Sequence, residues 1–380
     1  MRMTTWLTSK QPPPKSSGLS GAKRALVAML WYWWCRVTEA YLHGKPSCQG
    51  VFKASPEDFQ VTEILELPVT EPSEQAGEHQ WLWVEKKGAN TAFVASQIAE
   101  FAGVKERDVS YSGLKDRHAL TYQWFSVQLP GQALLDWARL EHPEFKVLTA
   151  ALQPRKLKTG THKGNHFVLR IRQIDQPEVF AQRWQAIVEK GVPNYFGAQR
   201  FGHNGQNIEQ AKRWFKGELK RRPSRHQSGL YLSAARSFLF NQVVHERLSA
   251  NRLQPEVGDA MMLQGSQSFF VVDSIDDALK ARFASGDIQL TAPLPGSGRQ
   301  LTQANIAELE AGVYVRYPDL YQGLRKQRID EGRRALLLQL QEPQMRWLTD
   351  DCAELEFTLG RGAFATSVLR ELIDDVPHEK

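Results

Sequence analysis

The order of secondary-structure patterns along this chain constrains its fold more than any other sequence feature. Residues 59–62 (FQVT) alternate apolar and polar side chains, which is typical of a half-buried strand. The same alternation returns near the C-terminus at residues 355–359. Between these regions, residues 207–216 and 233–248 repeat apolar side chains with helical spacing. Strand patterns at both ends with helices between them predict an α+β protein in which one domain is interrupted by an inserted one.

The N-terminal 39 residues differ from the rest of the chain. An apolar run at residues 25–35 follows Lys23 and Arg24, which resembles the basic and apolar regions of a signal peptide. No small-residue cleavage site follows, and Arg36 comes directly after the run. We therefore interpret residues 1–39 as an extension outside the fold, and a signal peptide as the less favoured alternative.

Length and cysteine content limit the remaining classes of protein. The 380 residues are 42% hydrophobic and 24% charged, which fits a folded protein of about two domains. The three cysteines form no CxxC pair, which argues against a disulfide framework and a structural zinc site and favours a reducing cytoplasm. No run approaches the ~20 apolar residues that span a bilayer, so we expect no membrane association.

Positive charge is concentrated in two short segments. The formal net charge is +6, and residues 212–225 alone carry seven cations against one acid. A second group has no acid between its members and comprises Arg155, Lys156, Lys158 and Lys163. A local excess of this kind suits phosphate binding, although the first segment alone is also typical of a solvated helix end. Two such segments together favour a nucleic acid as the partner without distinguishing RNA from DNA.

The loop at residues 113–119 (GLKDRHA) is the best candidate for chemistry. It lies between two apolar strand patterns, and Asp116 has a cation on each side, Lys115 and Arg117. If both cations lie within about 4–6 Å, they hold the carboxylate ionised and lower its pKa below about 3.9. Such a carboxylate suits a nucleophile or general base, but an aspartate that caps its own turn gives the same pattern.

A second candidate group lies at the start of a later strand pattern. Asn165 and Phe167 are two residues apart, so their side chains share one face, where the amide can hydrogen-bond a base and the ring can stack on it. From the residues alone, Phe167 is better explained as a core residue. Phe364 is either a buried anchor or a stacking residue. His162 and His166 are four residues apart at a strand entry, where helical metal-ligand spacing does not apply, so we expect no metal site.

Seven motifs in this order resemble the TruD-type tRNA pseudouridine synthase family from about Ala40 to the C-terminus. They are YLHGKP (41–46), KASPEDFQVTE (53–63), GLKDRHA (113–119), RKLKTGTHKGNHF (155–167), VPNYFGAQRFG (192–202), LSAARSFLFNQ (232–242) and FATSVLREL (364–372). The resemblance implies a pseudouridine-synthase core with a mixed, mainly antiparallel sheet and flanking helices, plus an inserted α+β domain. It implies a catalytic domain at 40–190, an inserted domain at 191–338, and the C-terminal part of the catalytic domain at 339–380.

The resemblance also implies an activity and a set of site residues. The family isomerises uridine 13 of transfer RNA to pseudouridine without a cofactor or metal, and Asp116 stands at the position of its catalytic aspartate. The implied substrate-binding residues are Phe59, Asn165, Phe167, Phe364 and Lys53. We predict RNA contacts at Arg155, Lys156, Lys163, Arg200, Arg221 and Arg222. We expect a monomeric cytoplasmic protein. The carboxylate can begin the reaction by attacking C1′ or C6, or by removing the 2′ proton, and the sequence does not rank these routes.

Two other classes of function remain as alternatives. A non-catalytic RNA-binding or RNA-chaperone protein would use the same basic segments without the aspartate. A metal-dependent nuclease is less favoured, because no cluster of carboxylates surrounds Asp116 in the sequence.

Overall fold

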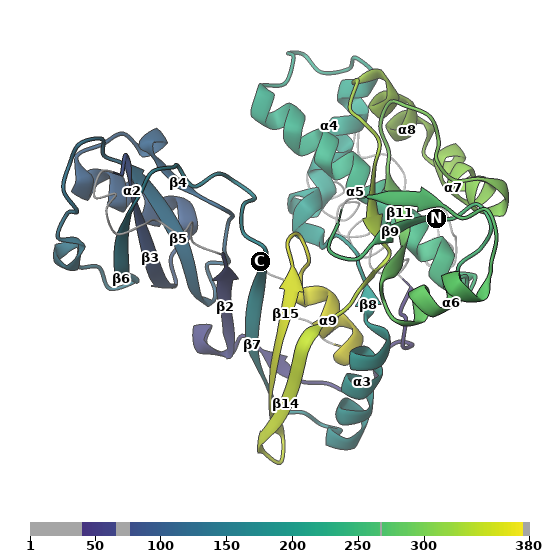
Figure 1. Ribbon diagram of the computed structural model, residues 1–380, viewed down its shortest axis with the longest axis horizontal. Coiled ribbons are helices and arrows are strands. Elements are labelled where there is room, and N and C mark those ends of the chain that lie inside the picture. The colour runs from purple at the N-terminus through teal and green to yellow at the C-terminus, as the bar shows by residue number, and fades with distance from the viewer. Residues whose placement is uncertain (1–39, 66–76, 267, 375–380) are drawn as a thin grey trace, which may run out of the picture. The chain divides into compact units, whose positions relative to one another are not determined.

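The computed structural model describes residues 40–65, 77–266 and 268–374 (Figure 1). Within these ranges the chain forms two compact units. Unit 1 contains Val192–Leu338 together with the residues from Ala40 to Gly44, and unit 2 contains Lys45–Gly191 together with the chain from Gln339 onward. The apolar run at residues 25–35, and the interpretation given to it above, lie outside the described residues.

Unit 2 is built on one nine-stranded sheet. Its main path runs in the order β14 (Gln341–Thr349), β15 (Cys352–Gly360), β7 (Gly164–Arg172), β2 (Phe59–Ile64), β5 (Leu120–Gln128), β3 (His79–Lys87) and β6 (Phe145–Gln153). Two short strands extend it, because β1 (Val51–Phe52) pairs with β7 and β4 (Val109–Tyr111) pairs with β5. Only the β2–β5 pair is parallel, at the centre of the sheet. The sheet is therefore mixed and mainly antiparallel, as predicted.

Helices of unit 2 pack against its sheet through apolar side chains, and Figure 1 shows where these helices lie. Helix α2 (Thr91–Ala102) begins at Asn90, whose side chain caps Phe93 N, and ends at Gly103 in the left-handed conformation that glycine favours. It buries Val94 and Ile98 against Phe125 and Val127 of β5. Helices α3 (Pro177–Lys190) and α9 (Ala365–Leu372) pack against each other. The apolar alternation of the strands thus places one core beneath α2.

Unit 1 combines a small sheet with five α-helices in the described part of the chain. Its four-stranded sheet has the order β10 (Phe269–Val271), β9 (Ala260–Leu263), β11 (Ile288–Leu294) and β12 (Gly332–Ala335), and β8 (Val192–Pro193) pairs separately with β13 (Leu337–Leu338). The helices are α4 (Gln206–Phe215), α5 (Arg225–Ser249), α6 (Asp277–Ala284), α7 (Ala304–Arg316) and α8 (Pro318–Lys326). Both units mix helices and sheet, so the α+β class is confirmed.

The longest helix begins earlier than the sequence predicted. We expected a helix from Ser233, whereas α5 begins at Arg225 after an N-cap at Ser224. The Ser224 hydroxyl accepts from Gln227 N, and Gln227 Oε1 accepts from Ser224 N, so both backbone donors at the helix start are satisfied. None of the helices in the described ranges is both long and apolar enough to cross a membrane.

Candidate active site

The loop that carries Asp116 connects β4 to β5 in unit 2, and hydrogen bonds to side chains of three other elements hold its backbone. Gly113 O accepts from Gln123 Nε2 at 3.1 Å, and Lys115 N donates to Thr91 Oγ1 at 3.0 Å. Asp116 O accepts from Lys86 Nζ at 2.7 Å. Because side chains of the sheet and of α2 supply these partners, the loop has a fixed conformation rather than an open turn.

The carboxylate of Asp116 is held by one ion pair and one backbone donor. Lys53 Nζ forms an ion pair with Asp116 Oδ2, and His118 N donates to Oδ1 at 3.0 Å. The two side chains of the pair are only 11% and 20% exposed, respectively. Lys53 lies just after β1 with a φ of 57°, a conformation that non-glycine residues seldom adopt. The pair therefore joins two segments 63 residues apart in the sequence.

The cations beside Asp116 in the sequence have partners on other segments. Lys115 Nζ pairs with Glu63 Oε2 at 2.8 Å, and Arg117 Nε donates to Gly88 O at 2.9 Å. The expectation that these neighbours also lower the pKa of the Asp116 carboxyl stays a prediction. The hydrogen bonds that hold the loop backbone also determine where each of its side chains points. The ion-pair partner of Asp116 is Lys53, which is distant in the sequence.

A buried ion pair supports the loop from below. Glu63 lies on β2 and its side chain is fully buried, while that of Lys115 is 5% exposed. The second oxygen of Glu63 accepts from Trp124 N at 3.4 Å. Because Lys115 belongs to the loop and Glu63 to β2, the pair fixes the path of the loop relative to the sheet. Removing either partner would leave an uncompensated charge inside unit 2.

His162 anchors the start of the loop and is not placed to bind metal. Ser112 Oγ lies 2.6 Å from His162 Nδ1 and also accepts from His162 N at 2.9 Å. Burial, with smaller contributions from Lys115 and Arg361, lowers the pKa of His162 to about 4, so the ring is neutral at physiological pH. In the described part of the chain, no group of three or more His, Cys, Asp or Glu residues is arranged to hold a metal ion.

Asn165 lies on β7 directly opposite Glu63 of β2. Residues opposite each other on neighbouring strands share a face of the sheet, so Asn165 stands on the face that supports the Asp116 loop through Glu63 and Lys115. Its Oδ1 is buried and accepts no hydrogen bond from the described residues. A buried amide oxygen without a partner is uncommon in folded proteins and marks a position where a ligand can donate a hydrogen bond.

The predicted aromatic residues divide into buried and half-buried rings. Phe59 and Phe167 are buried, with ring centroids 6.3 Å apart in an edge-on arrangement. Lys53 Nζ lies 4.3 Å from the centroid of the Phe59 ring, within the range of a cation–π contact. Phe167 also stacks on Phe357 at 5.5 Å, so it is a core residue, as its position in the strand indicated. Phe364 is the N-cap residue of α9 and is half-buried.

Phe364 belongs to a segment that is tied to the Asp116 loop through one intermediate turn. Arg361 N donates to Lys163 O at 3.0 Å, and the Arg361 side chain donates to Gly160 O. Gly160 N in turn donates to Ser112 O at 2.7 Å, at the start of the loop. The structure thus links the predicted residues Asp116, Lys163 and Phe364 through neighbouring backbone.

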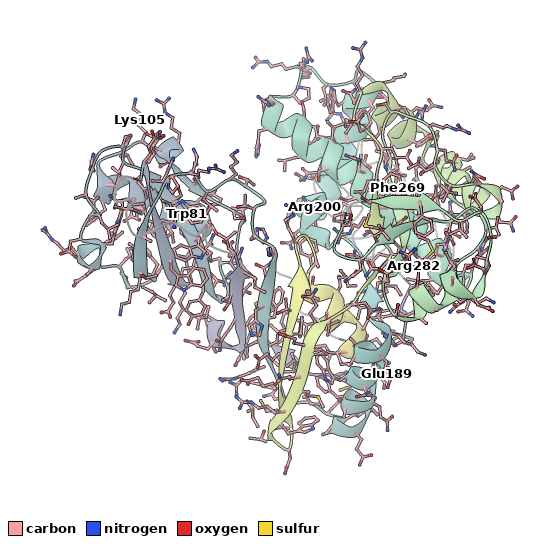
Figure 2. The ribbon with its side chains drawn as sticks, in the orientation of Figure 1. Trp81, Lys105, Glu189, Arg200, Phe269 and Arg282 are labelled. Atoms are coloured by element: carbon pink, nitrogen blue, oxygen red, sulfur yellow. The ribbon has the colours of Figure 1, made fainter. Side chains whose placement is uncertain are left out.

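The basic group of Arg155, Lys156, Lys158 and Lys163 is exposed on an anchored turn of unit 2. Arg155 and Lys156 are exposed, whereas Leu157 between Lys156 and Lys158 is buried against Trp81 and Trp124. Trp81, labelled in Figure 2, also donates through Nε1 to Arg155 O at 2.9 Å. The apolar anchor therefore holds the turn while its charges face solvent.

The basic segment 212–225 lies in unit 1 and runs from the last turn of α4 to the first residue of α5. Two of its seven cations are matched by acids, since Lys212 pairs with Glu209 at 2.8 Å and Lys216 pairs with Asp319 at 2.5 Å. Arg221 and Arg222 are exposed and form no ion pair with any described residue. Their positive charge is therefore available to a polyanion.

Arg200 occupies a different environment in unit 1 (Figure 2). It lies in a short 3-10 helix, Ala198–Phe201, and its guanidinium is 5.6 Å from the centroid of the Phe196 ring. Arg334 lies over the same ring at 4.1 Å. Burial lowers the pKa of Arg200, and burial together with the charge of Arg200 lowers the pKa of Arg334 to about 10. Arg200 and Arg334, both partly buried against the Phe196 ring, therefore concentrate positive charge at this position of unit 1.

Sequence reasoning missed two buried interactions that support the loop. One is the hydrogen bond from Lys86 to Asp116 O, and the other is the ion pair of Lys115 with Glu63. Lys86 is the second-to-last residue of β3, within the run VEKKG. From Leu82 onward the strand buries alternate residues, Leu82, Val84 and then Lys86, so a lysine at position 86 falls on the buried face. That conflict between charge and alternation was the available signal.

The fold itself places the chain in a class of known structures. A solved structure from Methanosarcina mazei, titled "Crystal Structure of the Putative tRNA pseudouridine synthase D (TruD)", superimposes with a TM-score of 0.69 at 21% sequence identity. The likeness covers 90% of this chain and 97% of that one. At this identity the likeness shows the fold, which is that of an α+β pseudouridine-synthase core with an inserted domain.

Sequence comparisons then identify the family. A family profile described as "tRNA pseudouridine synthase D (TruD)" matches residues 37–221 and 206–372. A protein named tRNA pseudouridine synthase D from Idiomarina loihiensis is 48% identical over 335 residues, covering 88% of this chain and 94% of that protein. One of the same name from Aeromonas hydrophila is 46% identical over 336 residues, covering 88% and 93%. The chain belongs to the TruD family, and the resemblance inferred from its motifs is confirmed.

Proposed function

We propose that this protein is a tRNA pseudouridine synthase that converts uridine 13 of transfer RNA to pseudouridine, with Asp116 as the catalytic residue. The observation that supports this assignment most strongly is the fixed carboxylate of Asp116, which Lys53 and His118 N hold within a chain of the TruD family. Lys53 keeps the carboxylate in its anionic form, and the anchored loop fixes its position. A nucleophile or base needs both properties.

The proposed reaction rearranges one glycosidic bond without a net change in composition. The C1′–N1 bond of uridine breaks, the freed base rotates, and a C1′–C5 bond forms. C5 then loses its proton to solvent and N1 gains one, so atoms and electrons balance without an oxidant or a reductant. The carboxylate of Asp116 starts this sequence at the ribose or the base, and we propose that no metal or cofactor takes part.

We propose that Asn165 and Phe364 hold the base while it is detached. The target uridine must leave its stack, which costs a few kcal/mol, and stacking on an aromatic ring returns roughly 1–3 kcal/mol. The buried Oδ1 of Asn165 can accept from N3–H of the base, and the half-buried ring of Phe364 can stack on its face. Phe59 and Phe167 are buried, so we propose that they support Lys53 and Asn165 from behind.

We propose that the exposed cations bind the phosphates of the transfer RNA. In unit 2 these are Arg155, Lys156 and Lys163, and in unit 1 they are Arg221 and Arg222, with the partly buried Arg200 as a further contact. Phosphate contacts determine register and orientation on the RNA and carry little sequence information. The rigid site in unit 2 then acts on the uridine that this register presents.

The test is the release of tritium from transfer RNA whose uridines are tritiated at C5. We expect wild-type protein to release the label and Asp116→Asn to release it at least about a thousandfold more slowly, with transfer RNA affinity within a few-fold of wild type. The matched control is Asp136→Asn, because Asp136 is an exposed acid of the same unit without a side-chain hydrogen bond at its helix start. It should leave the rate unchanged.

The same assay separates the alternatives. Equal release by wild type and Asp116→Asn would remove Asp116 from the chemistry. Binding without release by wild type would favour a non-catalytic RNA-binding protein, and cleavage of the RNA that stops with EDTA would favour a nuclease. The position of the product is checked by mapping pseudouridine in transfer RNA incubated with the protein, where uridine 13 is the expected site.

A further inference from the structure

Two consecutive lysines at the end of β3 point in opposite directions. Lys87 is exposed and forms an ion pair with Glu57 at the surface, whereas Lys86 is 0% exposed. Adjacent residues of a strand face opposite sides of the sheet, so Lys86 is directed into unit 2. Placing an ammonium group in a protein interior is costly, and such groups are found where they interact with a specific partner.

The ammonium group of Lys86 binds the loop that carries Asp116. Its Nζ donates to Asp116 O at 2.7 Å and to Ala89 O at 3.0 Å. Among the described residues Lys86 forms no salt bridge, so both of its acceptors are backbone carbonyls. Burial lowers the pKa of Lys86 to about 8, Asp116 opposes that shift, and Lys115 adds to it. The charge of Asp116 therefore affects the pKa of Lys86, and the ammonium group of Lys86 also binds the backbone carbonyl of Asp116.

The other charged groups around the loop have partners of their own. Lys115 of the loop is matched by Glu63 of β2, and Arg117 donates to Gly88 O. His118 is exposed at the far end of the loop, and Lys53 contacts the carboxylate itself. Lys86 joins the interior of the sheet to the backbone carbonyl of Asp116.

We propose that Lys86 is a positioning residue for the reaction, which fixes the main chain of Asp116 and supplies a buried positive charge that stabilises its carboxylate. This inference rests on the proposed function of Asp116 and adds a residue that does not touch the substrate. Two effects should disappear together when Lys86 is replaced with Met. The backbone carbonyl of Asp116 loses its donor, and the anionic form of Asp116 loses a nearby cation, so its pKa rises.

The first experiment measures single-turnover tritium release from transfer RNA between about pH 5 and 9. Lys86→Gln keeps a donor of similar length without the charge, and Lys86→Met removes both. We expect Lys86→Gln to lower the rate about tenfold, with the KM for transfer RNA within about twofold, and to move the acid limb of the profile to higher pH. Lys86→Met should be slower still. The matched control, Lys87→Gln, changes the neighbouring outward-facing lysine and should leave rate and profile unchanged.

A second measurement requires no substitution of Lys86. The side-chain resonance of Lys86 is titrated in protein labelled with carbon-13 lysine, in wild type and in Asp116→Asn. Because coupling between two sites is reciprocal, loss of the Asp116 charge should lower the pKa of Lys86. An unchanged pKa, or an acid limb that Lys86→Gln leaves in place while wild type is active, would overturn the inference. Inactivity of wild type on every transfer RNA would instead contradict the proposed function. In that case the titration alone would test whether Lys86 and the Asp116 carboxylate interact.

Discussion

The Asp116 loop of unit 2 and the basic segment 212–225 of unit 1 are built on opposite principles. Side chains from the sheet and from α2 bind the backbone of the loop, and the support includes one fully enclosed ion pair. In the basic segment, Arg221 and Arg222 face solvent without an ion-pair partner among the described residues. Chemistry requires a group at one position, whereas phosphate binding requires positive charge over an area.

This difference has a thermodynamic consequence. Replacements around the loop disturb groups whose partners are already buried, so they should change both stability and rate. Replacements in the basic segment remove solvated charge, so they should change affinity and its salt dependence while the fold remains stable. Four sets of substitutions test this contrast, and each has a control variant.

The largest effect is expected from Glu63→Ala. It leaves the ammonium of Lys115 buried without a counter-charge, which costs about 3–5 kcal/mol of the free energy of unfolding. Thermal melting and urea unfolding of the variant provide the measurement. The control is Glu209→Ala, which removes the partner of Lys212 at the surface of α4 and should cost under about 1 kcal/mol. Equal losses in the two variants would show that the Lys115 pair is not the main support of the loop.

A smaller effect on catalysis is expected from Asn165→Ala. If Asn165 accepts a hydrogen bond from the base, its loss should lower the rate of tritium release by about 10- to 100-fold, because one bond to a bound polar group contributes about 1–3 kcal/mol. His166→Ala is the control, since His166 is the next residue of β7 and faces the other side, where it contacts Thr358 and Glu356. A similar loss of rate in both variants would indicate a general effect on the strand.

Local sequence patterns predicted the elements of this fold better than the partners of its charges. The cap at Asn90 and the stop at Gly103 follow short-range rules, and the strand predicted from the alternation of residues 355–359 lies within β15. The pairing of Asp116 with Lys53 was not predictable from spacing, because the two residues are 63 positions apart. The family resemblance did mark both residues as site positions. Which cation faces which carboxylate depends on tertiary packing, and no periodicity encodes it.

The basic segment should respond to substitution in a way that the loop does not. Replacing both Arg221 and Arg222 with Ala should weaken transfer RNA binding and reduce the slope of log affinity against log salt by about 1.4–1.8, if each contacts one phosphate. The melting temperature should stay close to that of wild type. Lys216→Ala is the matched control, because its ammonium is already paired with Asp319 and should change the slope less. An unchanged slope in the double variant would place the segment away from the RNA.

The smallest effect concerns His162, which holds the start of the Asp116 loop. Its pKa is about 4 in the folded protein and 6.5 in an ordinary environment, so between these values the unfolded chain binds the proton and the folded protein does not. The contribution of this group to the free energy of unfolding is therefore complete above about pH 6.5 and is lost as the pH falls toward 4.

Because the His162 ring is partly exposed, we expect wild type to lose only about 1 kcal/mol of the free energy of unfolding relative to His162→Asn between pH 6.5 and 5. Urea unfolding of both proteins at these two pH values measures the difference. The control is His226→Asn, which makes the same replacement at an exposed histidine beside the basic segment. If wild type instead gained stability relative to His162→Asn on acidification, the folded protein would favour the charged form of His162. That result would contradict the argument that burial keeps this ring neutral.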